Sequence, residues 1–148
     1  MKRVLFVCIG NACRSQMAEG FARAYGADVM IAASAGLGPA MNVARDTKAA
    51  MAEKGIDLRD HFPKAIRHLG RAQFDLVINM SGSEILPEQV AGADIVEWDV
   101  DDPVMMTFQE HCKIRDRIET LVMKLVLDLR DAPKEPRMRG QGSGRLEL

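Results

Sequence analysis

A strand, a loop and the start of a helix are predicted by the stretch VLFVCIGNACRSQMAEG, residues 4–20. Its first four residues, Val4–Val7, are apolar and rich in β-formers, which is typical of a strand covered on both faces. After the loop from Cys8 to Ser15, apolar side chains recur at helical spacing from Met17 to Tyr25, and Gly26 supplies a stop. The stretch therefore predicts a strand, a tight loop and a helix in direct succession.

The rest of the chain alternates in the same way. Further strands are predicted at Val29–Ala33, Phe74–Met80 and, more weakly, Asp94–Trp98. A helix is expected from about Asp46 to Lys54, and a last one follows a capping box formed by Thr107 and Glu110 and ends before Pro133. This order favours an α/β fold, a three-layer domain with a four-stranded parallel twisted sheet and helices on both faces. We expect one catalytic domain at residues 1–132 and a flexible C-terminal tail at 133–148.

Composition excludes several classes of protein. The chain has 148 residues, with 20 Lys and Arg against 21 Asp and Glu, so it lacks the basic excess of a nucleic-acid or membrane-binding surface. No run is apolar for the roughly 20 residues that span a bilayer, which predicts a cytoplasmic protein without a membrane partner. The three cysteines, Cys8, Cys13 and Cys112, form neither a disulfide framework nor a zinc pattern. We therefore expect no metal and no cofactor.

The loop from Cys8 to Ser15 has the features of an anion site with a nucleophile. Successive N–H groups at a helix start form a concave anion site, here built from Ile9, Gly10, Asn11, Ala12 and Cys13. Gly10 and Asn11 tolerate the left-handed backbone angles that a tight curl requires. Arg14 offers a planar fork of donors for two oxyanion oxygens, and these charges favour the thiolate of Cys8. Ser15 can donate its hydroxyl to the sulfur.

A purely structural interpretation of Cys8 also exists, because a cysteine at the end of a strand is often only a small buried hydrophobic residue. The spacing of cysteine, arginine and serine on a strand–loop–helix joint favours catalysis. A dinucleotide or Walker loop is excluded, since neither GxGxxG nor GxxxxGK[ST] occurs. A phosphoryl transfer at Cys8 also needs an acid for the departing oxygen, and Asp102, stiffened by Pro103, is the best candidate. Asp99 and Asp101 compete with it.

These residues resemble the signature of the low-molecular-weight protein tyrosine phosphatase superfamily, which includes arsenate reductases of the same fold. The resemblance covers roughly residues 2–130, through the CxGNxCRS loop, the Ser-Ala-Gly after the second strand and the Asp-Asp-Pro near residue 102. It implies that Cys8 is the nucleophile, Arg14 the oxyanion clamp, Ser15 the thiolate stabiliser and Asp102 the general acid. It also implies that Asn11 holds the shape of the loop. His61 stands where family phosphatases often place a histidine that supports this asparagine, although a surface histidine is the alternative.

The departures from the family pattern concern the substrate. Tyrosine phosphatases of the family usually carry aromatic walls, where this chain has Met41 and Val104-Met105, so the rim cannot stack on a phenol ring. Thioredoxin-coupled arsenate reductases use a Cys-Gly after the third strand and another cysteine later. This chain has Ser81-Gly82 there, so a three-cysteine relay cannot operate. Cys13 can protect Cys8 by a reversible disulfide, as the family allows, or simply fill the base of the loop.

Three functions remain open at this point. The first, and the one the sequence favours, is a phosphatase that hydrolyses phosphate monoesters, with phosphotyrosine or another phosphoprotein as partner, through a phosphocysteine intermediate. The second is an arsenate reductase that takes arsenate as its oxyanion and uses an external small-molecule thiol. The third is a phospho-ligand binding module without turnover, which has no need of a thiolate. Fold alone cannot separate the first two.

Overall fold

The computed structural model describes residues 1–70 and 72–133. Four strands form one parallel sheet: β1 (Lys2–Cys8), β2 (Met30–Gly36), β3 (Leu76–Asn79) and β4 (Asp94–Glu97). Three α-helices accompany it: α1 (Arg14–Tyr25), α2 (Arg45–Ala52) and α3 (Phe108–Asp131). The predicted tail at 133–148 lies, except for Pro133, outside the described residues.

The strand order is β2-β1-β3-β4, so β1 pairs with a parallel neighbour on each side. This explains why Val4 to Cys8 are buried on both faces, as the apolar run predicted. All four carboxyl ends meet at one edge of the sheet, which is where parallel α/β sheets place their ligands. The loop after β1 and the segment after β4 therefore reach the same edge.

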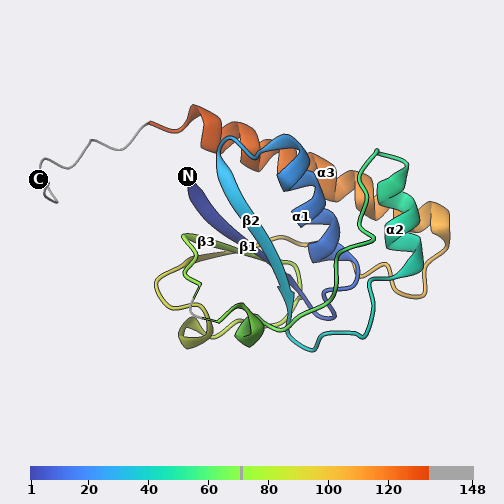
Figure 1. Ribbon diagram of the computed structural model, residues 1–148, viewed down its shortest axis with the longest axis horizontal. Helices are drawn as coiled ribbons and strands as arrows, with labels where there is room; N and C mark the ends of the chain where they lie inside the picture. The colour runs from blue at the N-terminus through green and yellow to red at the C-terminus, as the bar shows by residue number, and fades with distance from the viewer. Residues whose placement is uncertain (71, 134–148) are drawn as a thin grey trace, which may run out of the picture.

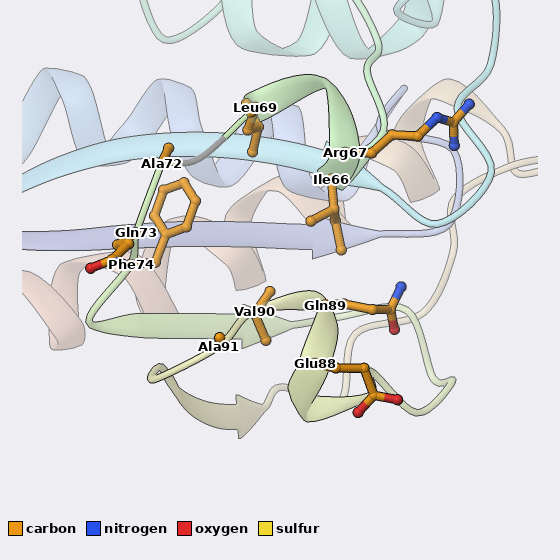
Figure 2. A pocket seen from close by; sticks show the side chains of 11 residues that line it. Ile66, Arg67, Leu69, Ala72, Gln73, Phe74, Glu88, Gln89, Val90 and Ala91 are labelled. Atoms are coloured by element: carbon orange, nitrogen blue, oxygen red, sulfur yellow. The ribbon is translucent and has the colours of Figure 1, made fainter.

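The sheet has helices on both faces, as predicted, but the two faces differ. Figure 1 shows α1, α2 and α3 on one side of the sheet, while among the described residues the other side carries two short 3-10 helices, η1 (Ile66–Leu69) and η2 (Pro87–Gln89). These two turns were not predicted from the sequence. They flank a cavity of about 420 Å³ (Figure 2) and pack near a small apolar cluster that includes Leu5, Val77 and Val90.

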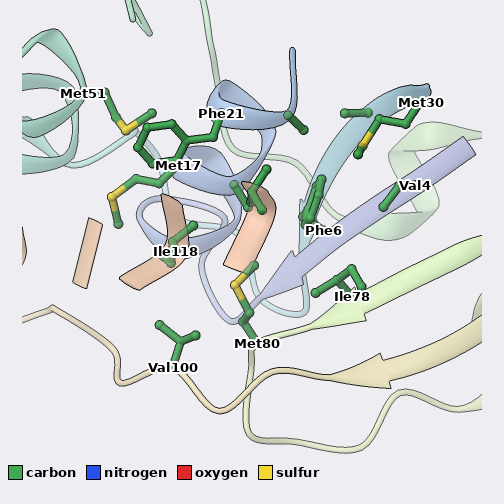
Figure 3. Packing of buried hydrophobic residues seen from close by; sticks show 14 of the residues in the cluster. Val4, Phe6, Met17, Phe21, Met30, Met51, Ile78, Met80, Val100 and Ile118 are labelled. Atoms are coloured by element: carbon green, nitrogen blue, oxygen red, sulfur yellow. The ribbon is translucent and has the colours of Figure 1, made fainter. Parts of the chain in front are cut away.

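The larger core lies between the sheet and the α-helices. Figure 3 shows Phe6 and Ile78 of the strands in one cluster with Met17 and Phe21 of α1 and Ile118 of α3. Each of these side chains is at most 1% exposed. Full burial of a side chain of this size contributes about 1.5–3 kcal/mol, so this cluster fixes α1, and with it the loop before α1, against the sheet.

The ends of the elements differ from prediction mainly next to the loop. Helix α1 begins at Arg14, inside the predicted loop, and β2 continues to Gly36 instead of ending near Ala33. The capping box before α3 is confirmed, because Thr107 Oγ1 accepts from the N–H of Glu110 at 3.1 Å. Among the described residues no helix is long and apolar enough to cross a membrane.

Candidate active site

The loop from Cys8 to Ser15 runs from the end of β1 to the first turn of α1. Asn11 adopts a positive φ of 51° and its side chain is fully buried. Gly10 is not among the described residues with positive φ, so of the two predicted left-handed positions only Asn11 is left-handed. A non-glycine residue in this region is uncommon and needs surrounding contacts to hold it. The side chain of Asn11 provides these contacts.

Asn11 joins the loop to three other segments of the chain. Its Nδ2 donates to Ser15 Oγ at 2.7 Å and to Ser34 Oγ of β2 at 3.0 Å. Its Oδ1 accepts from the backbone N–H of Lys64 at 3.0 Å and from Gln16 Nε2 at 3.1 Å. All four hydrogen-bonding positions of the amide are thereby used, which fixes its orientation. These contacts tie the loop to β2 and to the segment at Lys64, which fits the role that the resemblance implied for Asn11.

A second layer of buried polar groups holds the partners of Asn11. Ser34 Oγ donates to Glu19 Oε1 at 2.5 Å, and Glu19 is only 3% exposed. His61 Nδ1 lies 2.8 Å from Gln16 Oε1. His61 therefore supports Asn11 through Gln16 and not by direct contact. Burial lowers the pKa of His61.

The carbonyl groups of the loop are turned outward by the segment that follows β2. Four N–H groups of residues 37–44 each donate to one loop carbonyl at 2.9–3.1 Å, in the pairs Leu37 to Cys8, Gly38 to Ile9, Ala40 to Gly10 and Ala44 to Ala12. In a trans peptide the N–H points opposite to the C=O, so the N–H groups of residues 9, 10, 11 and 13 point to the inside of the curl. Within the described part of the chain these N–H groups have no acceptor in the observed hydrogen bonds. We call this concave row of N–H groups the cradle; its shape suits the anion that the sequence analysis expects here.

Gly36, at the end of β2, allows this close approach. A Cβ at this position would lie 2.6 Å from the carbonyl oxygen of Ile9 and 2.9 Å from the N–H nitrogen of Asn11. Both are backbone atoms, so the loop could not avoid the contact by moving a side chain. The Ser-Ala-Gly pattern after the second predicted strand therefore has two physical uses, a buried hydroxyl for Asn11 and a glycine against the loop.

Cys8 lies at the floor of the cradle and is 2% exposed. Its Sγ is 2.9 Å from Ser15 Oγ and 3.4 Å from the backbone nitrogen of Ser15. Because Ser15 Oγ already accepts from Asn11, its own proton is available for the sulfur. Two donors thus face Sγ, an arrangement that favours a thiolate as attacking and as leaving group.

Arg14 is held at both terminal nitrogens of its guanidinium group. Nη1 donates to the carbonyl oxygens of Met80, at 2.5 Å, and Val100, at 3.0 Å. Nη2 lies 3.4 Å from Asp102 Oδ2. Nε is buried and has no hydrogen-bond partner among the described residues. A buried donor without a partner costs about 1–3 kcal/mol, which an oxyanion in the cradle would recover by accepting from Nε.

Asp102 approaches the loop from the segment after β4, as the topology predicted. Its side chain is 44% exposed, and its Oδ1 accepts from the N–H of Val104 at 3.1 Å. Among the described residues, Asp102 is the one of the three acidic candidates that pairs with Arg14; Asp99 contacts Arg117 through its backbone oxygen. The carboxyl group is therefore positioned beside the anion site and open to solvent.

The rim of the site is apolar and exposed. Ile9 is 39%, Met41 92% and Met105 98% exposed. Met41 lies in the segment whose N–H groups bind the loop, between Ala40 and Ala44. Met105 has a positive φ of 69°, an uncommon angle for a residue other than glycine. None of these rim residues is aromatic, as noted from the sequence.

Cys13 and Cys112 are both free and partly buried. Burial raises the pKa of Cys13, and the charges of Cys8 and Asp102 raise it further. Cys112 lies on α3 with its Sγ 3.8 Å from Glu53 Oε1 and 3.5 Å from Arg115 Nη1, away from the loop. After β3, Ser81 is buried and its hydroxyl donates to Asn79 Oδ1. No group of three or more His, Cys, Asp or Glu among the described residues is arranged to hold a metal ion.

The fold and the loop together define an α/β protein with a cysteine at the base of a loop lined by N–H groups. The family model described as low molecular weight phosphotyrosine protein phosphatase matches residues 3–135, so the chain belongs to this family. Two of its similar relatives carry the names "Glutaredoxin arsenate reductase", from Synechocystis sp., and "Arsenate reductase 2", from Staphylococcus haemolyticus. Both are 34% identical; the first match covers 84% of this chain and 99% of the relative, the second 82% and 93%.

Solved structures agree with both branches of the family. A structure titled "An arsenate reductase in the phosphate binding state" aligns with a TM-score of 0.79 at 32% identity and covers 87% of this chain and 99% of the other. A low molecular weight protein tyrosine phosphatase from T. tengcongensis aligns with a TM-score of 0.74 at 32% identity, covering 86% and 99%. The resemblance seen in the sequence is thereby confirmed at the level of family and fold.

Proposed function

We propose that this protein is an arsenate reductase in which Cys8 attacks arsenate and an external thiol completes the reduction. The observation that carries the proposal is an oxyanion cradle closed around a thiol that faces two donors, in a chain whose similar relatives are named arsenate reductases. This ranks the arsenate reductase above the phosphatase that the sequence favoured. Both activities would use the same cradle, and the names of the similar relatives favour the reductase.

Each step of the proposed reaction has a residue that could carry it. The Cys8 thiolate attacks arsenic and one arsenate oxygen leaves as water, with Asp102 as the proton donor. The loop N–H groups and Arg14 hold the remaining oxygens. A thiolate then attacks the Cys8 sulfur, the electron pair of the S–As bond stays on arsenic, and arsenite leaves. A second equivalent of thiol reduces the resulting disulfide, so arsenate and two thiols give arsenite, water and one disulfide.

The need for an external thiol follows from the loop after β3. That loop offers Ser81 and Gly82 and no cysteine, and Cys112 on α3 faces Glu53, the residue after α2. A small-molecule thiol such as glutathione or mycothiol, or a protein carrier of the glutaredoxin class, would fill this role; one relative's name refers to glutaredoxin. Three free cysteines suit a reducing compartment, which we propose is the cytoplasm.

A phosphomonoesterase is the second candidate. It is favoured by the position of Asp102, whose carboxyl lies 3.4 Å from Arg14 and could protonate a departing alkoxide or phenoxide. The same carboxylate would then activate water against a phosphocysteine at Cys8. A phosphoprotein would be its partner, but the rim of Met41, Val104 and Met105 offers a phosphotyrosine ring no aromatic surface. Lost stacking is worth roughly 0.5–1.5 kcal/mol per ring pair, so phosphotyrosine should be a mediocre substrate.

The discriminating experiment measures both reactions with the same preparation. Arsenate is supplied with glutathione and glutaredoxin in one assay and with thioredoxin and its reductase in another, and p-nitrophenyl phosphate is supplied in a third. We expect sustained arsenite formation in the first assay and little in the second. Turnover of the phosphoester alone would identify the protein as a phosphatase. Turnover in none of the three assays would favour a phospho-ligand binding module.

A further inference from the structure

Asn79, a fully buried polar residue at the end of β3, has no role in the reaction described above. Its Oδ1 accepts from the backbone N–H of Ser81 at 3.0 Å and from the hydroxyl of Ser81 at 2.6 Å. Its Nδ2 donates to the carbonyl oxygen of Ser83 at 2.7 Å and lies 3.1 Å from both carboxylate oxygens of Glu97. The amide thus uses all of its hydrogen-bonding positions. We call Asn79, Ser81, Ser83 and Glu97 the Asn79 cluster.

The strand register brings Glu97 next to Asn79, because the two are paired as the last residues of β4 and β3. An amide group can turn by half a rotation, which exchanges its oxygen and its nitrogen, but a carboxylate can only accept hydrogen bonds. Glu97 therefore favours the orientation in which Nδ2 points to β4 and Oδ1 points to Ser81. The carbonyl oxygen of Ser83, which is also an acceptor, favours the same orientation.

One peptide unit connects the Asn79 cluster to Arg14. The N–H of Ser81 and the C=O of Met80 belong to the same peptide, and in a trans peptide these two groups point in opposite directions. Asn79 Oδ1 holds the N–H on one side, and on the other side the carbonyl oxygen accepts from Arg14 Nη1 at 2.5 Å. The orientation of one buried amide is thereby transmitted to the guanidinium group.

Hydrogen bonds rather than close packing hold Arg14 on this side. A cavity of about 240 Å³ is lined by Arg14, by Met80 and Val100, and by Glu97 of the cluster. Figure 3 shows the side chains of Met80 and Val100 in the main core, while their carbonyl oxygens accept from Arg14 Nη1. If the Met80 carbonyl turned away, the guanidinium would lose one of its two carbonyl partners and would have space to move into.

We propose that Asn79 and Glu97 are positioning residues for Arg14, an inference that rests on the oxyanion role of Arg14 proposed above. Glu97 orients the Asn79 amide, Asn79 orients the peptide between Met80 and Ser81, and the carbonyl of that peptide fixes Nη1. Nε and Nη2 are then aimed at the oxyanion before it binds, which is how a donor lowers the free energy of a developing charge without rearrangement. The alternative is that Asn79 only closes the loop after β3.

Binding of inorganic phosphate to the reduced full-length protein, measured by calorimetry at neutral pH, tests the positioning role. Asn79→Leu keeps the approximate size and the net charge but removes every hydrogen bond of the amide. We expect it to weaken phosphate binding by at least about 10-fold and to lower kcat/KM for arsenate by a similar factor. In an Arg14→Lys background, which has no planar fork to aim, Asn79→Leu should weaken binding by less than about 2-fold. Such non-additivity indicates that Asn79 acts through Arg14.

Glu97→Ala separates positioning from charge by the direction of its effect. Removing a carboxylate near an anion site should, by charge alone, strengthen phosphate binding. We expect a weakening of about 3-fold or more, because the Asn79 amide loses the partner that orients it. Val77→Ala is the matched control, since Val77 is fully buried on the same strand and belongs to the small apolar cluster. It should lower Tm by creating a small cavity and leave phosphate affinity within about 2-fold of wild type.

The outcomes distinguish this inference from the proposed function. Equal losses from Asn79→Leu in both backgrounds, a loss no larger than that of Val77→Ala, or unchanged or tighter binding in Glu97→Ala would each show that Asn79 only closes the loop, while the reductase activity stands. If melting curves show that Asn79→Leu does not fold, Glu97→Ala decides alone. If the variants behave as expected but wild type forms no arsenite, positioning stands and the proposed function fails. If wild type binds no phosphate, this inference fails with the oxyanion site.

Discussion

Replacing Gly36 by alanine should damage the anion cradle from outside the loop. The added Cβ would lie 2.6 Å from the Ile9 oxygen and 2.9 Å from the Asn11 nitrogen, where real Cβ atoms are essentially never closer than 3.0 Å. The loop backbone must therefore move by several tenths of an ångström. Overpacking of this kind costs about 1–3 kcal/mol of unfolding free energy. For a domain of this size that corresponds to a decrease of roughly 2–4 °C in Tm per kcal/mol.

Gly36→Ala should lose more activity than its decrease in unfolding free energy alone would cause. The displaced N–H groups belong to the oxyanion cradle, where the loss of one well-placed donor costs about 10²–10³-fold in rate. We therefore expect Gly36→Ala to lower kcat/KM for arsenate by about 10²-fold and to weaken binding of inorganic phosphate measured by calorimetry. Gly38→Ala is the matched control, because a Cβ there meets nothing within 4 Å although Gly38 also binds the loop through its N–H. Equal activity and phosphate affinity in the two variants would refute the reasoning.

Three further predictions follow from the same site. Cys8→Ser should abolish turnover of arsenate and of phosphoesters while still binding phosphate; residual activity above about one per cent would contradict the covalent step. Asp102→Asn should lower kcat by roughly 10²-fold for phosphoesters with poor leaving groups and less for good ones, and a larger loss in Asp101→Asn would reassign the acid. Because burial lowers the pKa of His111, the unfolded chain takes up its proton first as pH falls below about 6.5, so the free energy of unfolding should decrease there. Urea melts at neutral and mildly acidic pH should show a smaller decrease in His111→Asn than in wild type, and an unchanged slope would argue against a buried neutral imidazole.

The sequence predicted the elements that have strong local patterns. The buried run at Val4–Val7, the amphipathic helix after Thr107 and the loop between Cys8 and Ser15 all depend on residues close together in the chain, and the structure contains each of them. The two 3-10 turns have no such pattern. They exist because one face of the sheet must be covered, which depends on tertiary packing and not on periodicity.

The nucleophilic loop was predictable, but its support was not. Asn11 binds Ser34 and Lys64, which are 23 and 53 residues away, and Arg14 donates to the carbonyl of Val100, 86 residues away. Backbone carbonyls carry no sequence signal, and a buried serine on a strand looks like any small residue. Gln16 had no role assigned from the sequence, although it transmits the contact from His61.

The charged and polar groups outside the loop were hardest to predict. Nothing in the local sequence around Thr47 or His111 indicates that α2 and α3 bring their side chains within 2.9 Å of each other. Their juxtaposition depends on the packing of α3 against the other two helices, which is a property of the assembled fold.

The role of Cys8 in arsenate reduction is tested most directly by measuring arsenite formation with and without its thiol. Reduced wild-type protein and the Cys8→Ser variant are each given arsenate with glutathione and glutaredoxin, and arsenite is measured over many turnovers alongside hydrolysis of p-nitrophenyl phosphate. We expect continuous arsenite formation by wild type, none above background by Cys8→Ser, and inhibition of arsenite formation by inorganic phosphate. Arsenite formation that is equal in both proteins, or absent while the phosphoester is hydrolysed, would contradict it.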